Sequence, residues 1–515
     1  MTMSKYLLGV DIGTSACKVA IFSTDGRVLS QASREYAVHH PAPGHVEQDP
    51  EEWYRAVCEA IKDCLATGKI DPKAIAGVGV DGQSWSAIPV GRDGKVLART
   101  PIWMDTRAAD IASETLARVG FDRIFEVSGN GFEATYSTPK MLWFKKYRPE
   151  VYRQVHRFLQ SNSWIVYRLT GIMSQDKSQG YGVHTFNMKA GAWDEALCDE
   201  LGIERAHLPD ISECDQVIGT VNAKAAAETG LAIGTPVVAG GLDAACGTLG
   251  AGVVRPGQVQ EQGGQAGGMS ICVDKALAHP KLILSFHVVP KLWLLQGGTV
   301  GGGGALRWFR QELGGAEEVM AKDEGCNAFE ILSREASTVV PGADGVVFLP
   351  YMSGERSPIW DRNAKGVFYG LSYATTRAHM VRAVMEGCAF TLEHNLRTSA
   401  ETGVSVNELV AMGGAANSEV WTQIKADITG KRISVPSSDT STTLGAAILA
   451  GVGTGLYKSY EEAVASSIRI TRVHEPDAKN HARYQPVYNL FREIYENLKG
   501  TMRMQAEASI GKRPE

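Results

Sequence analysis

The same local pattern occurs twice in this sequence: an apolar run, a glycine-containing turn and a second apolar run. The first copy spans 6–22 with its turn at 11–15, and the second spans 259–273 with its turn at 263–268. Because short apolar runs bounded by turn residues indicate buried strands, each copy predicts a strand–turn–strand unit. Its recurrence indicates an internal duplication. We expect two related lobes with a hinge at 250–257.

Similar elements follow each copy. After the first copy we expect a strand at 28–36, an amphipathic helix at 50–67 and a strand at 75–80. After the second we expect a strand at 292–296 and a helix that begins at 304. This mixture predicts an α/β fold. A chain of 515 residues is long enough for two large lobes of this kind.

Charge and cysteine content exclude several classes of protein. Lys and Arg number 52 against 57 Asp and Glu, a formal net charge of −5, which argues against a protein that mainly binds nucleic acid or an anionic membrane. Nine scattered cysteines without a Cys-x-x-Cys pair predict neither a disulfide framework nor a zinc site. The N-terminal residues lack a signal-peptide pattern and no apolar run is long enough to span a bilayer, so we expect a cytoplasmic protein.

Glycine is unusually frequent, with 56 residues that cluster where apolar strands end. Since glycine lets the backbone turn sharply and approach a ligand closely, these clusters predict a nucleotide or phosphate held by main-chain groups. The turn Asp11-Ile12-Gly13-Thr14-Ser15 could direct backbone N–H groups and two hydroxyls at phosphate oxygens, and Asp11 could hold Mg²⁺. The alternative for this turn is a plain hairpin with an Asx turn.

Asp243 follows a predicted strand at 237–241 and stands at the start of a predicted helix. Aspartate is a good helix N-cap, and the helix dipole favours its ionised form. A carboxylate at the edge of a cleft could also accept a proton from a substrate hydroxyl. The residues alone leave both interpretations open.

Three further segments have a functional and a structural interpretation. Residues 77–82 fit G-x-G-x-x-G, but a predicted strand at 83–90 follows instead of a helix, so dinucleotide binding is not expected. Residues 412–418 join a strand to a helix and form either an anion or nucleotide seat or a simple packing turn. The small-residue helix at 443–447 allows close approach of a flat group or of another helix.

Taken together, these residues resemble the FGGY family of carbohydrate kinases, within the actin/hexokinase/Hsp70-like superfamily. The resemblance runs from Tyr6 to about Tyr457. It includes 136–144, which is similar to the family's Lys-x-x-Trp signature, and a second stretch at 366–387. Residues 349–356 resemble the xylulokinase branch.

The resemblance implies an α/β fold with two ribonuclease H-like lobes around a central cleft, here 1–254 and 255–515. It implies ATP-dependent, Mg²⁺-assisted transfer of the γ-phosphoryl group to a hydroxyl of a small open-chain sugar, with a ketopentose such as D-xylulose as the first expectation. Ribulose, a tetritol and an autoinducer-type sugar are alternatives, as is a non-catalytic sugar or nucleotide sensor on the same fold. A homodimer is one oligomeric state that we consider.

The resemblance also carries over a set of site residues. Asp243 falls at the catalytic base, and Asp11 falls at the first phosphate turn near the metal. The positions implied for ATP are Gly13, Thr14, Ser15, Gly264, Gln265, Gly303, Gly304, Gly413, Gly414 and Asn417. The positions implied for the sugar are Gln83, Ser84, Trp85, Asp105 and Asp243.

Two segments depart from the family pattern. The second phosphate loop, usually Gly-Thr-Ser-Gly, reads Gly-Gln-Ala-Gly at 264–267, so phosphate contacts there must come from backbone N–H groups or Gln265. Ser84 and Trp85 replace the Met-His pair that follows the pocket glutamine in xylulokinases. We therefore expect a changed preference among ketoses.

Overall fold

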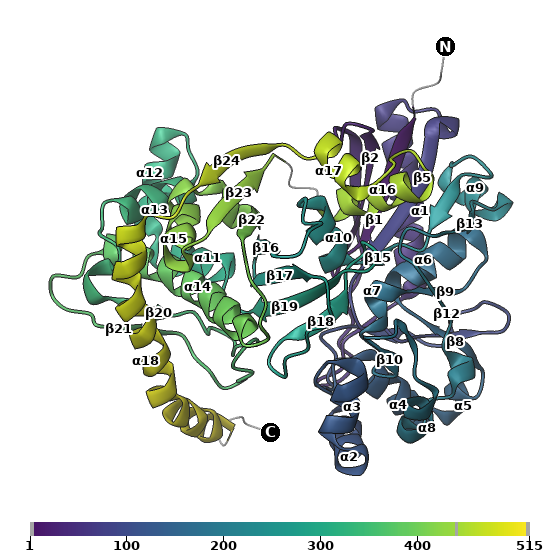
Figure 1. Ribbon diagram of the computed structural model, residues 1–515, viewed down its shortest axis with the longest axis horizontal. Helices are drawn as coiled ribbons and strands as arrows, with labels where there is room; N and C mark the ends of the chain where they lie inside the picture. The colour runs from purple at the N-terminus through teal and green to yellow at the C-terminus, as the bar shows by residue number, and fades with distance from the viewer. Residues whose placement is uncertain (1–4, 438–440, 511–515) are drawn as a thin grey trace. The chain divides into compact units, whose positions relative to one another are not determined.

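The computed structural model describes residues 5–437 and 441–510 (Figure 1). The chain forms two compact units, and the first boundary between them follows Pro256. Unit 1 comprises Met1–Pro256, Cys272–Leu295 and Thr440–Arg469, and unit 2 comprises Gly257–Ile271, Gln296–Asp439 and Ile470–Glu515. Unit 1 thus includes two segments from the second half of the sequence.

A seven-stranded sheet forms the framework of unit 1, in the order β13-β14-β5-β1-β2-β3 with β15 beside β5. Its strands are β1 (Tyr6–Ile12), β2 (Ala16–Ser23), β3 (Val28–Glu35), β5 (Ile75–Gly82), β13 (Val217–Thr220), β14 (Pro236–Val238) and β15 (Gly241–Leu242). The first three strands are antiparallel, as the sequence predicts, and β5 runs parallel to β1. The register places Asp11 beside Asp81, and Asp81 beside Gly241. Three strand ends therefore meet at one edge of the sheet.

Helices cover this sheet on both faces. The predicted amphipathic helix is α1 (Pro50–Gly68), which packs against β2 and β3. On β1 and β5 lies α16 (Ser441–Gly453), next to α10 (Asp243–Gly250). A Cβ atom on Gly9 would come within 1.9 Å of the Thr443 carbonyl oxygen, so only glycine permits this approach. The small residues of α16 thus serve packing between helix and sheet and between helices.

The remainder of unit 1 surrounds the segment that follows β5. The predicted strand at 83–90 is wrong, because only β6 (Ile88–Gly91) is a strand there. Trp85 has a φ of 61°, which interrupts extended backbone. The neighbouring elements are β7 (Thr100–Pro101), α2 (Ala109–Val119), α3 (Phe121–Ser128), α4 (Ser137–Tyr147), β8 (Val155–Leu159), α6 (Ser161–Thr170) and α7 (Lys177–Gly180).

The second seven-stranded sheet has the order β18-β19-β17-β16-β22-β23-β24. Its strands are β16 (Gln258–Gly263), β17 (Gly267–Val273), β18 (Ile283–Phe286), β19 (Trp293–Thr299), β22 (Glu408–Met412), β23 (Arg432–Pro436) and β24 (Ile470–His474). Most of it belongs to unit 2, whereas β18 is grouped with unit 1. β16 pairs antiparallel with β17 and parallel with β22, which repeats the pairing of β1 with β2 and β5. The structure thus confirms the predicted recurrence of the strand–turn–strand unit, while β18 was not predicted.

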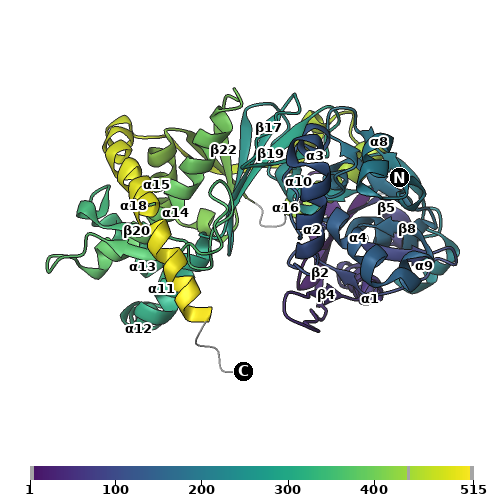
Figure 2. The ribbon, with the colours of Figure 1, turned by 90° about the horizontal axis from the view of Figure 1, so that it is seen from below.

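Long helices pack around the sheet of unit 2. They are α11 (Gly303–Leu313), α12 (Gly315–Glu324), α13 (Ala328–Ser337), α14 (Arg377–Ala400), α15 (Glu419–Thr429) and α18 (Ala478–Ile510). Figure 2 shows α18 running alongside α14 and α15, with which it is in contact. Their aromatic core includes Phe348, Phe390, Tyr484 and Phe491. Within the described residues no helix is long and apolar enough to cross a membrane.

Candidate active site

Three carboxylates gather at one edge of the unit 1 sheet, and we call Asp11, Asp81 and Asp243 the acidic cluster. Asp11 lies on β1, Asp81 lies beside it on β5, and Asp243 follows β15. Asp81 is fully buried and Asp11 nearly so, whereas Asp243 is half-buried. The adjacent strand ends thus bring together two residues singled out from the sequence, Asp11 and Asp243, and one that was not.

Burial shifts the ionisation of this cluster. It raises the pKa of Asp11, against the opposing charge of Lys18 and a hydrogen bond of 3.2 Å from the Thr442 hydroxyl. Burial, followed by the charges of Asp11 and Asp243, raises the pKa of Asp81 well above its usual range. Burial, followed by the charge of Asp11, raises the pKa of Asp243 to about 7. Asp243 can therefore release or accept a proton near neutral pH.

Asp243 is the first residue of α10 and is not its N-cap. The cap position belongs to Leu242, which has no side-chain capping bond. The Asp243 carboxylate instead accepts a hydrogen bond of 2.7 Å from the backbone N–H of Ala244. The capping interpretation of Asp243 is thus wrong, because the helix begins one residue earlier than a cap at this position requires.

An aromatic cluster of Trp85, Tyr136 and Tyr181 lies next to the acidic cluster. The Trp85 and Tyr136 rings stack with centroids 4.2 Å apart, and Tyr181 lies 5.9 Å from Trp85. The Tyr181 hydroxyl donates a 2.9 Å hydrogen bond to Ser84 Oγ. The charge of Asp243 contributes to raising the pKa of Tyr181, which places that phenol within electrostatic reach of the acidic cluster.

Trp85 is a half-buried residue in a backbone conformation that tryptophan seldom adopts. Its φ of 61° lies in the left-handed region, which is costly for a bulky side chain. Its Nε1 is buried and has no well-formed hydrogen bond among the described residues. A Cβ on Gly182 would lie 2.9 Å from the indole, so this glycine leaves room for the ring. Strained residues of this kind concentrate at functional sites.

The first glycine turn is connected to the segments around Trp85 by amide side chains. Gln83 Nε2 donates to Gln48 Oε1, and Gln48 Nε2 donates to the Thr14 carbonyl, each over 2.8 Å. Trp103 Nε1 donates to the Thr14 hydroxyl over 2.9 Å. Gln83 is itself buried, so it supports the turn from the protein interior through its bond to Gln48. Ser15 is the exposed residue of this turn.

Two other predicted residues serve internal contacts. Gly13 donates its N–H to the Ala16 carbonyl and thereby closes the first turn. Asp105 is fully buried, and its carboxylate accepts from the Val46 N–H and pairs with the Arg107 guanidinium over 2.8 Å. Asp105 therefore lies behind the surface and would act on a ligand only through the residues that it holds.

Unit 2 contains a pocket of about 670 Å³, which we call the glycine-lined pocket. It brings together five of the residues predicted to bind ATP: Gly264, Gln265, Gly303, Gly414 and Asn417. The opposite wall comes from α11 and the start of α13 and includes Leu306, Arg307, Asn327, Phe329 and Ser333. Gly413 adjoins the pocket with a φ of 82°, and a Cβ there would come within 2.9 Å of the Gly263 carbonyl oxygen.

The second predicted phosphate loop is attached to the start of α11. The N–H groups of Gly303 and Gly304 donate to the carbonyls of Gly264 and Gln265 over 2.8 and 2.9 Å. A Cβ on Gly304 would come within 2.3 Å of Gln265 Nε2, so the Gln265 side chain lies directly against this glycine. The loop that departs from the family pattern is thus fixed by its backbone.

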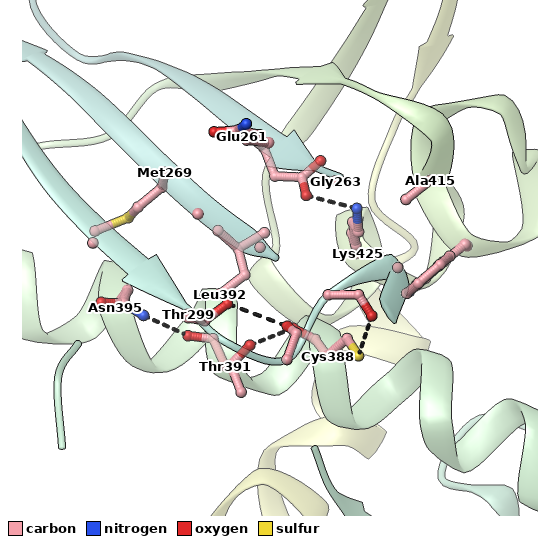
Figure 3. A pocket seen from close by; sticks show the side chains of 18 residues that line it. Glu261, Gly263, Met269, Thr299, Cys388, Thr391, Leu392, Asn395, Ala415 and Lys425 are labelled. Carbon is pink, nitrogen blue, oxygen red and sulfur yellow. Dashed lines mark hydrogen bonds and ion pairs between the residues drawn. The ribbon is translucent and has the colours of Figure 1, made fainter. Parts of the chain in front are cut away.

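A buried ion pair lies beneath this loop. Lys425 Nζ is 2.7 Å from Glu261 Oε1, and both side chains are about 5% exposed or less (Figure 3). Between the loop and α14 is a cavity of about 20 Å³, room for roughly one water molecule. Glu261 lies on β16 and Lys425 on α15, so the pair connects the strand before one glycine turn with the helix after another.

Comparison with known proteins identifies the chain. Models of the N- and C-terminal domains of the FGGY family of carbohydrate kinases match residues 6–250 and 274–454. This protein is an FGGY-family carbohydrate kinase. The resemblance inferred from the sequence is thereby confirmed, and the protein is a phosphotransferase that acts on a sugar.

The relatives of this kinase have more than one sugar specificity. A xylulose kinase of Bacillus subtilis is 30% identical over 96% of this chain and 97% of its own. A gluconokinase of the same species is 29% identical over 96% of this chain and 97% of its own. The crystal structure of a xylulose kinase from Rhodospirillum rubrum superimposes with a TM-score of 0.88 at 28% identity, covering 97% of this chain and all of that one. The two-lobed α/β fold class is confirmed as well.

Several residues of the candidate site were not predicted from the sequence. Asp81 is the fifth residue of the G-x-G-x-x-G segment at 77–82, and a carboxylate near the end of an apolar strand, one strand from Asp11, is a usable signal. Tyr136 begins the signature stretch at 136–144 but was not assigned to the sugar, and Tyr181 gave no signal, because their approach to Trp85 depends on the folding of distant segments. Phe329 lies on a helix that the sequence analysis did not assign to any site.

Proposed function

We propose that this kinase transfers the γ-phosphoryl group of ATP to a hydroxyl of a neutral open-chain sugar, with a ketopentose such as D-xylulose as the first candidate. One observation carries the proposal: Asp243, with a pKa of about 7, lies within electrostatic reach of the aromatic cluster. A proton acceptor is thus placed next to a surface suited to a sugar. Trp85 offers a ring face for sugar C–H groups and an N–H for a hydroxyl.

In the proposed reaction the sugar binds in unit 1 and Asp243 acts as the general base. Its carboxylate takes the hydroxyl proton while the sugar oxygen bonds to the γ-phosphorus. The bond from that phosphorus to the β–γ bridging oxygen breaks, and ADP leaves with the electron pair.

ATP is proposed to bind in the glycine-lined pocket of unit 2. Its volume of about 670 Å³ lies within the range of about 300–1,000 Å³ that is usual for small-molecule and cofactor sites. Gly264 and Gly414 line it with backbone, so phosphate and ribose groups could approach the main chain closely. Asn417 adds a side-chain amide for hydrogen bonding.

Mg²⁺ is proposed to bind at Asp11. Within the described residues no group of three or more His, Cys, Asp or Glu side chains could hold a metal ion. Mg²⁺ usually keeps several waters and binds through one or two carboxylates plus substrate phosphates, which fits the single carboxylate of Asp11. When bound, the ion supplies neutralising charge for the phosphates. Thr442 and Lys18 hold the Asp11 carboxylate in place.

We favour a neutral sugar over an aldonate such as gluconate. The cations next to the aromatic cluster are already engaged: Lys140 donates to three backbone carbonyls, and Arg107 pairs with Asp105 and Glu47. The carboxylates of the acidic cluster would repel a substrate carboxylate. Among the described residues, neither of these two cations is free to neutralise the charge of an aldonate.

The test is ADP release by the purified protein with Mg²⁺–ATP and a panel of D-xylulose, D-ribulose, erythritol and D-gluconate. We expect turnover with a ketopentose and little with gluconate, and Asp243→Asn serves as the inactive control. Absence of turnover with every sugar would contradict the proposal and favour a sensor. If D-xylulose were by far the best substrate, the Ser84-Trp85 pair would not alter the preference among ketoses.

A further inference from the structure

Lys140 has an ammonium group that is entirely enclosed by backbone carbonyls. The residue lies on α4 and is fully buried. Its Nζ donates to the carbonyls of Trp85 over 2.9 Å and Ile102 over 2.7 Å, and to the carbonyl of Thr135. An ammonium group has three donors, so each of them is used on backbone.

The three acceptors belong to three separate segments that meet at the aromatic cluster. Trp85 is itself a member of that cluster. Thr135 directly precedes Tyr136, whose ring stacks on Trp85. Ile102 directly precedes Trp103, which donates to the Thr14 hydroxyl in the first glycine turn. One ammonium group therefore connects the residues that the proposed sugar site uses.

The Lys140 ammonium group supplies hydrogen-bond donors to irregular backbone, whose carbonyls are not paired in a helix or a sheet. Carbonyls without a partner are costly when they are removed from water, and these three lie outside the hydrogen-bond ladders of the sheets. The Ile102 carbonyl also accepts from the Asp105 N–H over 2.9 Å, so Lys140 is its second donor. A buried ammonium is more costly still unless it is fully bonded, so the lysine and the carbonyls stabilise one another. Because Trp85 has a left-handed backbone, its conformation depends on the groups around it. The bond from Lys140 to the Trp85 carbonyl is one of these constraints.

Trp143, one helical turn beyond Lys140, supports the same region. Residues three apart lie on one face of a helix. The Arg107 guanidinium lies 4.8 Å from the centre of the Trp143 ring and pairs with Asp105. The Lys-x-x-Trp spacing thus places two supports beneath the segment that begins at Ile102.

We propose that Lys140 is a positioning residue for sugar recognition: its ammonium group holds the backbone of Trp85, Ile102 and Thr135 in the arrangement that fits the sugar. The inference rests on the proposed function of unit 1. It requires no contact between Lys140 and the substrate. It assigns to Lys140 an effect on sugar binding and none on the glycine-lined pocket of unit 2.

The test is a graded series at this position, with the Michaelis constants for sugar and ATP measured separately. Lys140→Gln keeps two N–H donors without the charge, and Lys140→Met fills a similar space without donors. We expect the sugar KM to rise about threefold or more in Lys140→Gln and more than tenfold in Lys140→Met, with the ATP KM within twofold of wild type. Lys146→Met is the matched control, because Lys146 lies on the same helix but pairs at the surface with Glu114.

The outcomes separate this inference from the proposed function. A wild-type protein inactive with every sugar overturns the proposed function, and the inference with it. An active wild type together with an unchanged sugar KM in both variants overturns the inference alone. Equal rises in both KM values also overturn it, since they indicate general loss of structure. If Lys140→Met does not fold, Lys140→Gln decides the question by the same criteria, with thermal unfolding as the check on folding.

Discussion

The two candidate sites are built from different materials. In unit 1, side chains form the site: the carboxylates of the acidic cluster and the rings of the aromatic cluster. In unit 2, glycine backbone lines part of the pocket, and two of its loops are joined by main-chain hydrogen bonds. A site that moves a proton needs ionisable side chains, whereas one that holds phosphates can rely on backbone N–H groups. Substitutions should therefore affect chemistry most in unit 1.

Each site is supported by a buried lysine, but in a different way. Lys140 donates to three neutral carbonyls, whereas Lys425 pairs with the carboxylate of Glu261. Removing Lys140 takes one donor away from each of three neutral carbonyls, while removing Lys425 leaves an uncompensated buried charge. The second loss is the more costly. We therefore expect substitution of Lys425 to affect mainly stability and substitution of Lys140 to affect mainly sugar recognition.

The largest effect on stability is expected from Lys425→Met. The change leaves the Glu261 carboxylate buried without its partner, which costs about 3–5 kcal/mol of unfolding free energy. Urea unfolding measures it. The double variant Glu261→Gln/Lys425→Met should recover much of the loss, because no charge then remains buried. A single variant as stable as wild type would show that the pair does not stabilise unit 2.

The largest effect on turnover is expected from Asp243→Asn. Without a base, kcat should fall about 10²-fold or more. The thermal stability of the Asp243→Asn variant should instead rise. Because folding raises the pKa of Asp243 to about 7, the folded state favours the proton, and its stabilising contribution is lost as pH rises from about 4 through 7. Asn should therefore raise the Tm more at pH 8 than at pH 5. A variant with near wild-type turnover would remove Asp243 from the chemistry.

Trp85→Ala should affect recognition more than stability. Loss of the indole face and its N–H should raise the sugar KM at least tenfold and leave the ATP KM nearly unchanged. The Tm should fall little, because the ring is half-buried and alanine carries the same left-handed strain. Trp85→Gly is the matched variant, since it removes the ring and the strain of roughly 1–2 kcal/mol together. A loss of about 3–5 kcal/mol in Trp85→Ala would instead identify a core residue.

The smallest effect is expected at the second phosphate loop. Gln265→Thr/Ala266→Ser restores the hydroxyls that are usual in the family. Because the carbonyls of this loop are already bonded to Gly303 and Gly304, we expect the ATP KM to change by less than threefold. Steady-state kinetics at saturating sugar measure it. A tenfold improvement would show that the missing hydroxyls limit ATP binding.

Local sequence patterns predicted the framework of the fold well. The strands at 6–22 and 259–273 follow from apolar runs and glycine turns, and both paired as expected. The predicted strand at 83–90 was wrong, because Trp85 depends on contacts with Tyr136 and Lys140, which lie far along the chain. No local pattern contains that information.

The candidate site was partly predictable for the same reason. Asp11 and Asp243 could be chosen because each ends a strand. The bonds of Lys140 to Trp85 and Ile102 span 55 and 38 residues of sequence, so a signature spacing could mark the lysine but not its partners. Asp105 was predicted to bind the sugar, but its carboxylate accepts hydrogen bonds from the Arg107 guanidinium and the Val46 N–H.

The central claim is that Asp243 acts as a base from within a carboxylate cluster. The most direct test is the pH dependence of kcat/KM for the sugar between pH 5.5 and 8.5, at saturating Mg²⁺–ATP. Because the base must be ionised, kcat/KM should rise with pH through an apparent pKa of about 7, which belongs to the coupled cluster. In Asp243→Asn the residual activity should lose this rise. A wild-type profile that is flat over this range, or an identical rise in the variant, would contradict the account.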